Sequence, residues 1–169
     1  GQGLYVGKNP RFSRCIPQLN QVFPESKMIV LMRNPLEAIP SRISLMQAIW
    51  QHRDPNFTTL SPKQIQWILN NSIELYQRTE ADLDSIPANR RIVVGYRALK
   101  SHPSATLTRI REQLQLPAYS ENVQQQVQLL DQKHYQSKHH YDLGTYGLTE
   151  SDITRPLTNV IAKHQHLWS

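Results

Sequence analysis

The chain has 169 residues, of which 38% are hydrophobic and 19% charged; this suffices for one globular domain, residues 1–169, and excludes an intrinsically disordered chain. No apolar run approaches the ~18 residues of a membrane span, and the single cysteine, Cys15, cannot form an internal disulfide, so we expect a cytoplasmic protein without a transmembrane segment. The formal net charge of +6 indicates an anionic partner, but the scattered basic residues suit a small anion better than nucleic acid.

Strand and helix patterns alternate in the first part of the chain. Residues 3–7 predict a short strand, and apolar residues at helical spacing predict a helix over 11–23. The continuous apolar run 28–32 is typical of a strand that is covered on both faces. A helix over 34–50 and a polar loop over 51–60 follow.

A strong helix start comes next in the chain. Ser61 can cap the helix, Pro62 suits the first helical position, and Gln64 stands three residues after the cap. The apolar face beyond this start predicts a long helix over 62–85.

The alternation continues to the end of the chain. The expected elements are a strand over 91–99, a helix that Pro117 ends, a weakly amphipathic helix over 120–133, a loop rich in His and Tyr over 134–147, and a last helix capped by Thr149 and Asp152. Alternating strands and helices imply an α/β fold with a parallel sheet. Three strands would make a small sheet for a chain of this length.

Arg33 stands directly after the apolar run 28–32, where the carboxyl end of a buried strand is expected. Ligands of open α/β sheets bind at such ends. Asn34 can cap the next helix, Pro35 suits its first position, and Glu37 can complete a box-like cap. A guanidinium beside exposed helix N–H groups favours a phosphate or sulfate site. A surface salt bridge between Arg33 and a neighbouring carboxylate is the alternative.

The segment RNPLEAIPS, residues 33–41, resembles the 3′-phosphate-binding segment of sulfotransferases that use 3′-phosphoadenosine 5′-phosphosulfate (PAPS). In that family an Arg ends a strand, and a Ser eight residues later helps to hold the 3′-phosphate; Arg33 and Ser41 have this spacing. Three further segments resemble the family in the right order, the last of them its bacterial-type branch: GKNPRFSRCIPQLNQVFPESKMIVLMRNP, VVGYRALKSHPSATLTRIREQLQLP and HHYDLGTYGLTESDI. The resemblance covers most of the chain.

The resemblance implies a P-loop-NTPase-like three-layer fold with a parallel sheet, and transfer of a sulfuryl group from PAPS to an unidentified hydroxyl or amine. It implies a catalytic role for Lys8, near the bridging oxygen between phosphate and sulfate. It further implies that Arg33 and Ser41 bind the 3′-phosphate, that Tyr96 contacts the adenine, and that Lys138 lies in a loop over the nucleotide. The expected small-molecule partners are PAPS and its product, adenosine 3′,5′-bisphosphate, without a metal.

The sequence departs from the family at several positions. Pro40 lies inside the expected helix and can alter how Ser41 projects. Phe12 stands where many bacterial relatives have a His, and Arg97 stands where the family usually has an acidic residue. No segment of the Lys/Arg-Ser-Gly-Thr-Thr type, which holds the 5′-phosphosulfate in the family, occurs in the sequence. We therefore expect a sulfotransferase domain that is truncated at the N-terminus and inactive by itself.

Other functions stay open at this point. The chain can be a non-catalytic remnant that keeps nucleotide affinity, or a nucleotide-binding α/β protein of the P-loop kinase type, although a Walker-type Gly-Lys-Ser/Thr is absent from the sequence. A nucleic-acid-binding α/β protein has only the net charge of +6 in its favour.

Overall fold

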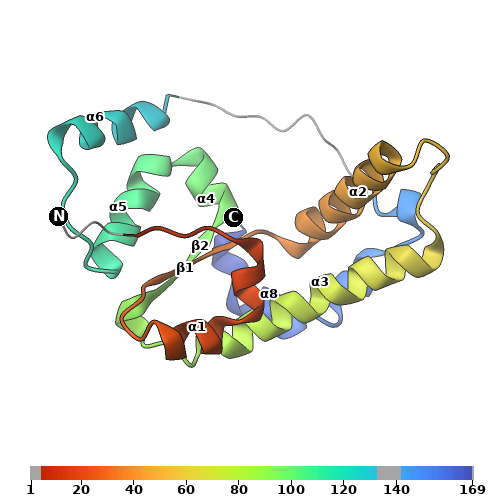
Figure 1. Cartoon of the computed structure of the whole chain (residues 1–169), viewed down its shortest axis with the longest axis horizontal. Helices are drawn as coiled ribbons and strands as arrows, with labels where there is room; N and C mark the ends of the chain where they lie inside the picture. Colours follow the sequence, from red (N-terminus) through yellow and green to blue (C-terminus); the bar gives the residue numbers. More distant parts are fainter. Residues whose placement is uncertain (1–4, 133–141, 169) are drawn as a thin grey trace.

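A computed structural model describes residues 5–132 and 142–168, and within them the chain has an α/β fold with a small parallel sheet (Figure 1). The sheet consists of β1 (Met28–Met32) and β2 (Arg91–Gly95), which are parallel neighbours. Met28 lies opposite Arg91, and Met32 lies opposite Gly95. The predicted strand at 28–32 and the predicted parallel pairing are therefore confirmed, and the carboxyl ends of the two strands meet at one edge.

Helices form most of the rest of the described chain. They are α1 (Ile16–Val22), α2 (Pro35–Arg53), α3 (Pro62–Leu83), α4 (Tyr96–Ser101), α5 (Pro103–Gln113), α6 (Glu121–Leu130), α7 (Glu150–Thr154) and α8 (Thr158–Lys163), with 3-10 turns η1 (Pro10–Arg14), η2 (Ala88–Arg90), η3 (Gly144–Tyr146) and η4 (Gln165–Leu167). None of the helices described in the structure is both long enough and apolar enough to cross a bilayer.

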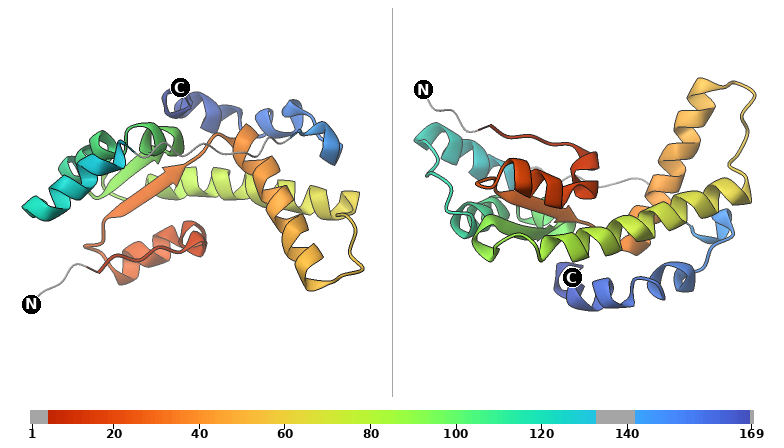
Figure 2. Two further views of the ribbon diagram at one scale, coloured as in Figure 1. Left: turned by 90° about the horizontal axis from the view of Figure 1, so that it is seen from above. Right: turned by 60° about the horizontal axis from the view of Figure 1, so that its bottom comes forward.

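The long helix α3 runs through the middle of the molecule. The left view of Figure 2 shows the sheet and α3 between the N-terminal segment with α1 on one side and the C-terminal helices on the other. Direct contacts of α3 with η1, α1, α2 and α8 agree with this arrangement. Segments from both ends of the chain are therefore held against one helix.

The main hydrophobic core lies beside the sheet rather than over it. It is formed by α2, α3 and the C-terminal segment: Ile39, Ile43, Leu60, Ile65, Ile68, Leu69, Leu148, Ile153, Leu157 and Val160. A smaller cluster of Val94, Ile110 and Leu114 packs β2 against α5. Most of the apolar burial, the main stabilising term of a fold, is therefore found around α3.

Several helix ends follow the predicted capping chemistry. Ser61 and Gln64 form a reciprocal capping box at the start of α3, as the sequence predicts. Thr149 and Asp152 form a second box at α7. Asn34 caps α2, because its Oδ1 accepts the N–H of Leu36 at 3.0 Å.

Two strand predictions are wrong in their extent. Residues 5–7 belong to no strand, and Tyr5 and Val6 are 91% and 79% exposed; residues 3 and 4 lie outside the described residues. The local pattern was insufficient because a strand also needs a neighbour to satisfy its backbone groups. The predicted strand over 91–99 ends at Gly95, because the good helix formers at 97–100, Arg-Ala-Leu-Lys, favour α4 instead.

Burial of β1 also differs from the prediction. Ile29 and Leu31 are about half exposed, at 50% and 49%, so the described residues cover this strand on only one face. The helix predicted over 11–23 is divided at Cys15 into η1 and α1. The loop predicted over 51–60 is shorter, because α2 continues to Arg53.

The C-terminal segment is attached to α3 by an ionic cluster. Glu80 forms an ion pair with Lys163 and a hydrogen bond of 2.5 Å between its Oε2 and Nε2 of His164. Burial alone would raise the pKa of Glu80, but the hydrogen bonds and charges of Lys163 and His164 outweigh it, and the pKa is lowered. A carboxyl group with a lowered pKa stabilises the fold above its unfolded pKa, and this contribution is lost as the pH falls through the folded pKa.

We expect Glu80→Gln to lower the free energy of unfolding at pH 7 by about 1–3 kcal/mol, because it removes the charged acceptor of the buried His164 and of Lys163. The difference from the unsubstituted chain should shrink as the pH falls below the ordinary pKa of a Glu side chain, about 4.3, and through the lowered pKa of Glu80 in the folded chain. Urea unfolding followed by circular dichroism at several pH values measures this. Glu74→Gln, an exposed position of the same helix, serves as the control. A difference that does not change with pH would contradict the assignment.

Candidate functional site

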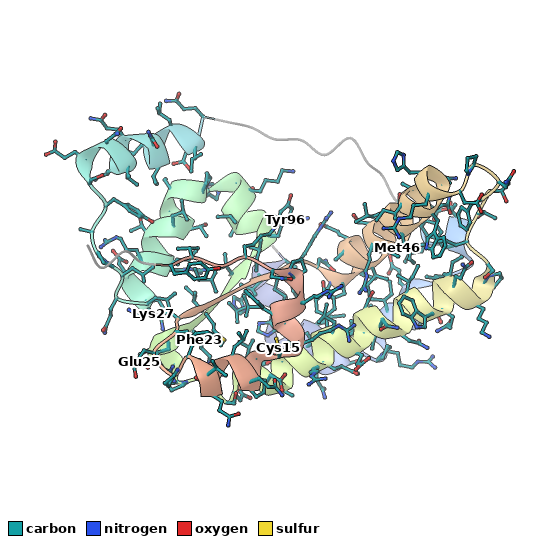
Figure 3. All side chains as sticks on the ribbon, viewed as in Figure 1. Cys15, Phe23, Glu25, Lys27, Met46 and Tyr96 are labelled. Carbon is teal, nitrogen blue, oxygen red and sulfur yellow. The ribbon has the colours of Figure 1, made fainter. Side chains whose placement is uncertain are left out.

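Arg33 and Tyr96 follow the two adjacent strands and meet at the carboxyl end of the sheet. The guanidinium carbon of Arg33 lies 5.2 Å from the centroid of the Tyr96 ring, within the range of a cation–π contact. Both side chains are half-buried. Figure 3 labels Tyr96 beside the start of α4. The parallel pairing thus joins two of the residues that the sequence predicts for one site.

The backbone at Arg33 is held in place by α3. The hydroxyl of Tyr76 donates a hydrogen bond of 2.7 Å to the carbonyl oxygen of Arg33. Burial strongly raises the pKa of Tyr76, so its hydroxyl stays protonated and remains a donor. The turn between β1 and α2 therefore has a fixed support on the long helix.

Glu37 bridges two guanidinium groups at this edge. Its carboxylate lies 3.4 Å from Nε of Arg33 and 3.2 Å from Nη2 of Arg97. The predicted box-like cap by Glu37 is wrong, because the two cations attract its carboxylate away from the helix N-terminus. Arg97 supplies one of these cations. It stands where the family that the sequence resembles usually has an acidic residue. The alternative of a surface salt bridge at Arg33 is thus present in the structure.

The C-terminal segment closes one side of the site. Leu167 packs so closely on Gly95 that a Cβ added there would lie 2.7 Å from the Leu167 carbonyl oxygen. Trp168 then lies beside Arg33, Tyr96 and Arg97, around a cavity of about 10 Å³. Its indole Nε1 is buried without a hydrogen-bond partner among the described residues.

This cavity has room for about one water molecule, so a nucleotide does not fit inside it. One face of the Tyr96 ring is turned to Arg33, which leaves the other face or the ring edge for contact with a base. A ligand of nucleotide size would therefore lie over the half-buried Arg33 and Tyr96 rather than between them.

The sequence predicts three other site residues besides Arg33 and Tyr96, namely Ser41, Lys8 and Lys138. Ser41 is half-buried on α2, which continues as a helix through the buried Pro40. Lys8 is exposed before η1, and the described residues show no hydrogen bond or ion pair between Lys8 and the Arg33 group. Lys138 lies outside the described residues.

A larger cavity of about 380 Å³ lies elsewhere, at the amino end of β2. Its charged lining includes Glu80, Asp84, Arg91, Arg109 and Lys163. Glu80 pairs with Lys163, and Asp84 pairs with Arg91, so most of these charges neutralise one another. Across residues 5–132 and 142–168, no three His, Cys, Asp or Glu side chains gather as a metal site would require.

Sequence reasoning missed three contributors to the site. Tyr76 belongs to no sequence motif, although a Tyr on the apolar face of a helix is also a buried hydroxyl that needs an acceptor. Arg97 was noticed as a departure but not as the partner of Glu37. Trp168 lies near the end of the chain, where no motif pointed to the site.

Comparison with known proteins identifies related sequences. The model of the family described as "Sulfotransferase family" matches residues 1–121. The omega-hydroxy-beta-dihydromenaquinone-9 sulfotransferases Stf3 of Mycobacterium bovis and Mycobacterium tuberculosis are each 30% identical to the chain over 112 residues, which is 64% of this chain. The matched part is 28% of the length of these relatives. No solved structure matches the chain significantly.

We expect Tyr76→Phe to destabilise the chain by about 1–2 kcal/mol, because the carbonyl of Arg33 loses its hydrogen-bond donor. Tyr146→Phe is a matched control: Tyr146 is also half-buried, and its hydroxyl has no hydrogen bond among the described residues. Urea unfolding of both variants measures the difference. Equal stability of the two variants would show that the Tyr76 hydroxyl does not support the turn.

Proposed function

The chain belongs to the sulfotransferase family, and we propose that it contributes the binding site for the 3′-phosphoadenosine part of the sulfuryl donor PAPS. On this proposal the parallel sheet is part of a P-loop-NTPase-like three-layer fold. The observation that carries the proposal is the contact between Arg33 and Tyr96 at the carboxyl ends of adjacent parallel strands. Ligands of α/β proteins bind at such an edge.

Arg33 can exchange its present partner for a phosphate. Its ion pair with Glu37 is partly exposed, with side chains that are 33% and 42% exposed. Exposed pairs of this kind contribute only about 0–1 kcal/mol, whereas a guanidinium can bind a phosphate through two parallel hydrogen bonds. The 3′-phosphate would thus replace the carboxylate, and the cap at Asn34 would stay in place.

The other residues are assigned by the family resemblance. The Ser41 hydroxyl would donate to the 3′-phosphate, and Tyr96 would contact the adenine through the side of its ring away from Arg33. Lys138 would belong to the loop that covers the nucleotide. Lys8 would stabilise negative charge that develops on the bridging oxygen as the donor's S–O bond breaks.

In the proposed reaction, an acceptor oxygen or nitrogen attacks sulfur while the bond from sulfur to the phosphate oxygen breaks. The leaving group is adenosine 3′,5′-bisphosphate, and the proton of the acceptor passes to a base. The names of the Stf3 relatives specify an omega-hydroxy acceptor. On that basis we favour a hydroxyl over an amine as the acceptor of the whole protein.

A second function, nucleotide binding without sulfuryl transfer, is favoured by two observations in the sequence. Phe12 occupies the position where many bacterial relatives have a His that can act as a base. The 169 residues also contain no Lys/Arg-Ser-Gly-Thr-Thr segment to hold the 5′-phosphosulfate. Both functions use the same Arg33–Tyr96 site for the nucleotide, and they differ in turnover.

We expect Arg33→Ala to weaken binding of adenosine 3′,5′-bisphosphate by about 2–3 kcal/mol, the range for a hydrogen bond to a charged group. Binding of adenosine 5′-monophosphate, which lacks the 3′-phosphate, should change much less. Isothermal titration calorimetry with both nucleotides measures the two losses.

Two controls make this experiment specific. Arg53→Ala removes an exposed arginine at the other end of α2 and should leave both affinities unchanged. Glu37→Gln removes the carboxylate that competes for Arg33, so it should strengthen binding of the bisphosphate. Equal losses of the two nucleotides in Arg33→Ala would show that Arg33 does not read the 3′-phosphate.

We expect no measurable sulfuryl transfer by the 169 residues alone, because they contain no Lys/Arg-Ser-Gly-Thr-Thr segment to hold the 5′-phosphosulfate. Preorganised donors around the transferring group supply much of the catalysis, and losing even one typically costs roughly a hundredfold. Transfer of labelled sulfate from PAPS to a panel of hydroxyl and amine acceptors is the measurement. The longer Stf3 relatives serve as the positive control for the assay. Turnover by the chain alone would show that another segment holds the phosphosulfate.

A further inference from the structure

Two further arginines, Arg14 and Arg42, are positioned by α3, apart from the Arg33–Tyr96 site. Nη2 of Arg14, from η1, lies 3.4 Å from Oδ1 of Asn71. Nη1 of Arg42, from α2, donates to Oγ of Ser72 at 3.1 Å. Asn71 and Ser72 are consecutive residues of α3, so guanidinium groups from two different segments approach neighbouring positions of this helix.

The two groups that bind the guanidiniums, the Asn71 amide and the Ser72 hydroxyl, are neutral, and each forms a further hydrogen bond within α3. The Ser72 hydroxyl donates to the carbonyl of Ile68 at 2.7 Å while it accepts from Arg42. The side-chain N–H of Asn71 donates to the carbonyl of Trp67 at 2.8 Å. The hydrogen bonds from Arg14 to Asn71 and from Arg42 to Ser72 orient the two guanidinium groups. They use only a few of the five N–H donors that each group carries. Both arginines are half-buried, so part of each remains accessible.

Within residues 5–132 and 142–168, no carboxylate neutralises this pair. Among the described residues no Asp or Glu forms an ion pair with Arg14 or Arg42, although Arg33, Arg78, Arg91, Arg97 and Arg111 each have one. The stretches outside the described residues contain no Asp or Glu in the sequence. Burial and, secondly, the positive charge of Arg14 lower the pKa of Arg42. Two partly desolvated like charges repel each other, and an anion between them would remove this cost.

We propose that Arg14 and Arg42 form an oxyanion subsite that binds a sulfate or phosphate group of a ligand. Arg42 lies on α2, about 12 Å along the helix from its cap at Asn34. The subsite is distinct from the 3′-phosphate position at Arg33 and Ser41, because Arg42 is turned about 100° around the helix from Ser41 and its guanidinium is bound to Ser72 of α3. The inference extends the proposed function, since the group is either the phosphosulfate end of the donor or an anionic group of the acceptor.

Inorganic sulfate is the probe for this subsite. Calorimetric titration at constant ionic strength, balanced with sodium chloride, should give saturable binding to the unsubstituted chain. Arg42→Gln and Arg14→Gln should each weaken this binding by roughly tenfold or more, because each removes charge-assisted hydrogen bonds. Arg53→Gln, an exposed arginine of the same helix, should bind as the unsubstituted chain does. Equal sulfate binding by all four proteins, or none by any of them, would overturn the proposal.

Thermal unfolding gives a second readout that a purely structural role would not produce. In sulfate-free buffer of low ionic strength, Arg14→Gln should raise the melting temperature, because it removes the repulsion while Gln stays neutral and polar. Sulfate should then raise the melting temperature of the unsubstituted chain more than that of the variant. If Arg14→Gln is destabilised equally with and without sulfate, Arg14 is a structural residue and the proposal fails.

Adenosine 3′,5′-bisphosphate distinguishes the two sources of the oxyanion. If the subsite holds a phosphate of the nucleotide, the nucleotide competes with sulfate and Arg42→Gln weakens both. If it holds a group of the acceptor, sulfate and nucleotide bind together and Arg42→Gln weakens only sulfate. The proposed nucleotide site is tested separately, since unchanged nucleotide binding in Arg33→Ala would contradict it. The sulfate titration tests the Arg14–Arg42 subsite whatever that result is.

Discussion

The helix α3 supplies polar partners for segments that are far apart in the sequence, and the arrangement of the molecule depends on them. Ser72 binds Arg42 of α2, Tyr76 binds the backbone of Arg33, and Glu80 binds Lys163 and His164 of the C-terminal segment. Asn71 contacts Arg14 of η1. Leaving such groups buried without partners would cost about 1–3 kcal/mol each. The same helix therefore fixes the registry of four segments in addition to burying its apolar residues.

The sheet itself is a weak source of stability in comparison. Two parallel strands satisfy few backbone groups, and Ile29 and Leu31 of β1 remain half exposed. The large apolar core lies instead between α2, α3, α7 and the start of α8. The sheet's contribution is geometric, since it sets Arg33 and Tyr96 at neighbouring positions, while α3 and its partners hold the strand ends in place.

Local patterns in the sequence predicted the elements whose cause is local. The caps at Asn34, Ser61 and Thr149 were identified because a capping residue and its partner lie within three positions of each other. The apolar run 28–32 predicted β1 with its observed bounds. The strand predicted over 3–7 is not formed by its described residues, 5–7, because pairing with a distant strand, which the local pattern does not encode, decides whether such a segment forms a strand.

The candidate site was predictable only in part, for the same reason. The position of Arg33 after a strand indicated an anion site, but its contact with Tyr96 depends on the register of two strands about 60 residues apart. The sharing of Glu37 by Arg33 and Arg97 depends on where α4 begins. Trp168 reaches the site because Gly95 allows Leu167 to approach β2 closely. None of these contacts leaves a pattern in neighbouring residues.

The two arginine sites differ in what an anion must displace. At Arg33 it competes with the Glu37 carboxylate, so a doubly charged phosphate with good geometry is favoured over a weakly bound ion. At Arg14 and Arg42 no carboxylate of the described residues has to leave, and mutual repulsion already favours any anion that enters. A selective site then lies just before α2, at Arg33, and a permissive one combines Arg42 of α2 with Arg14 of η1. A ligand with anionic groups at both ends would gain from both, since binding of one end raises the local concentration of the other.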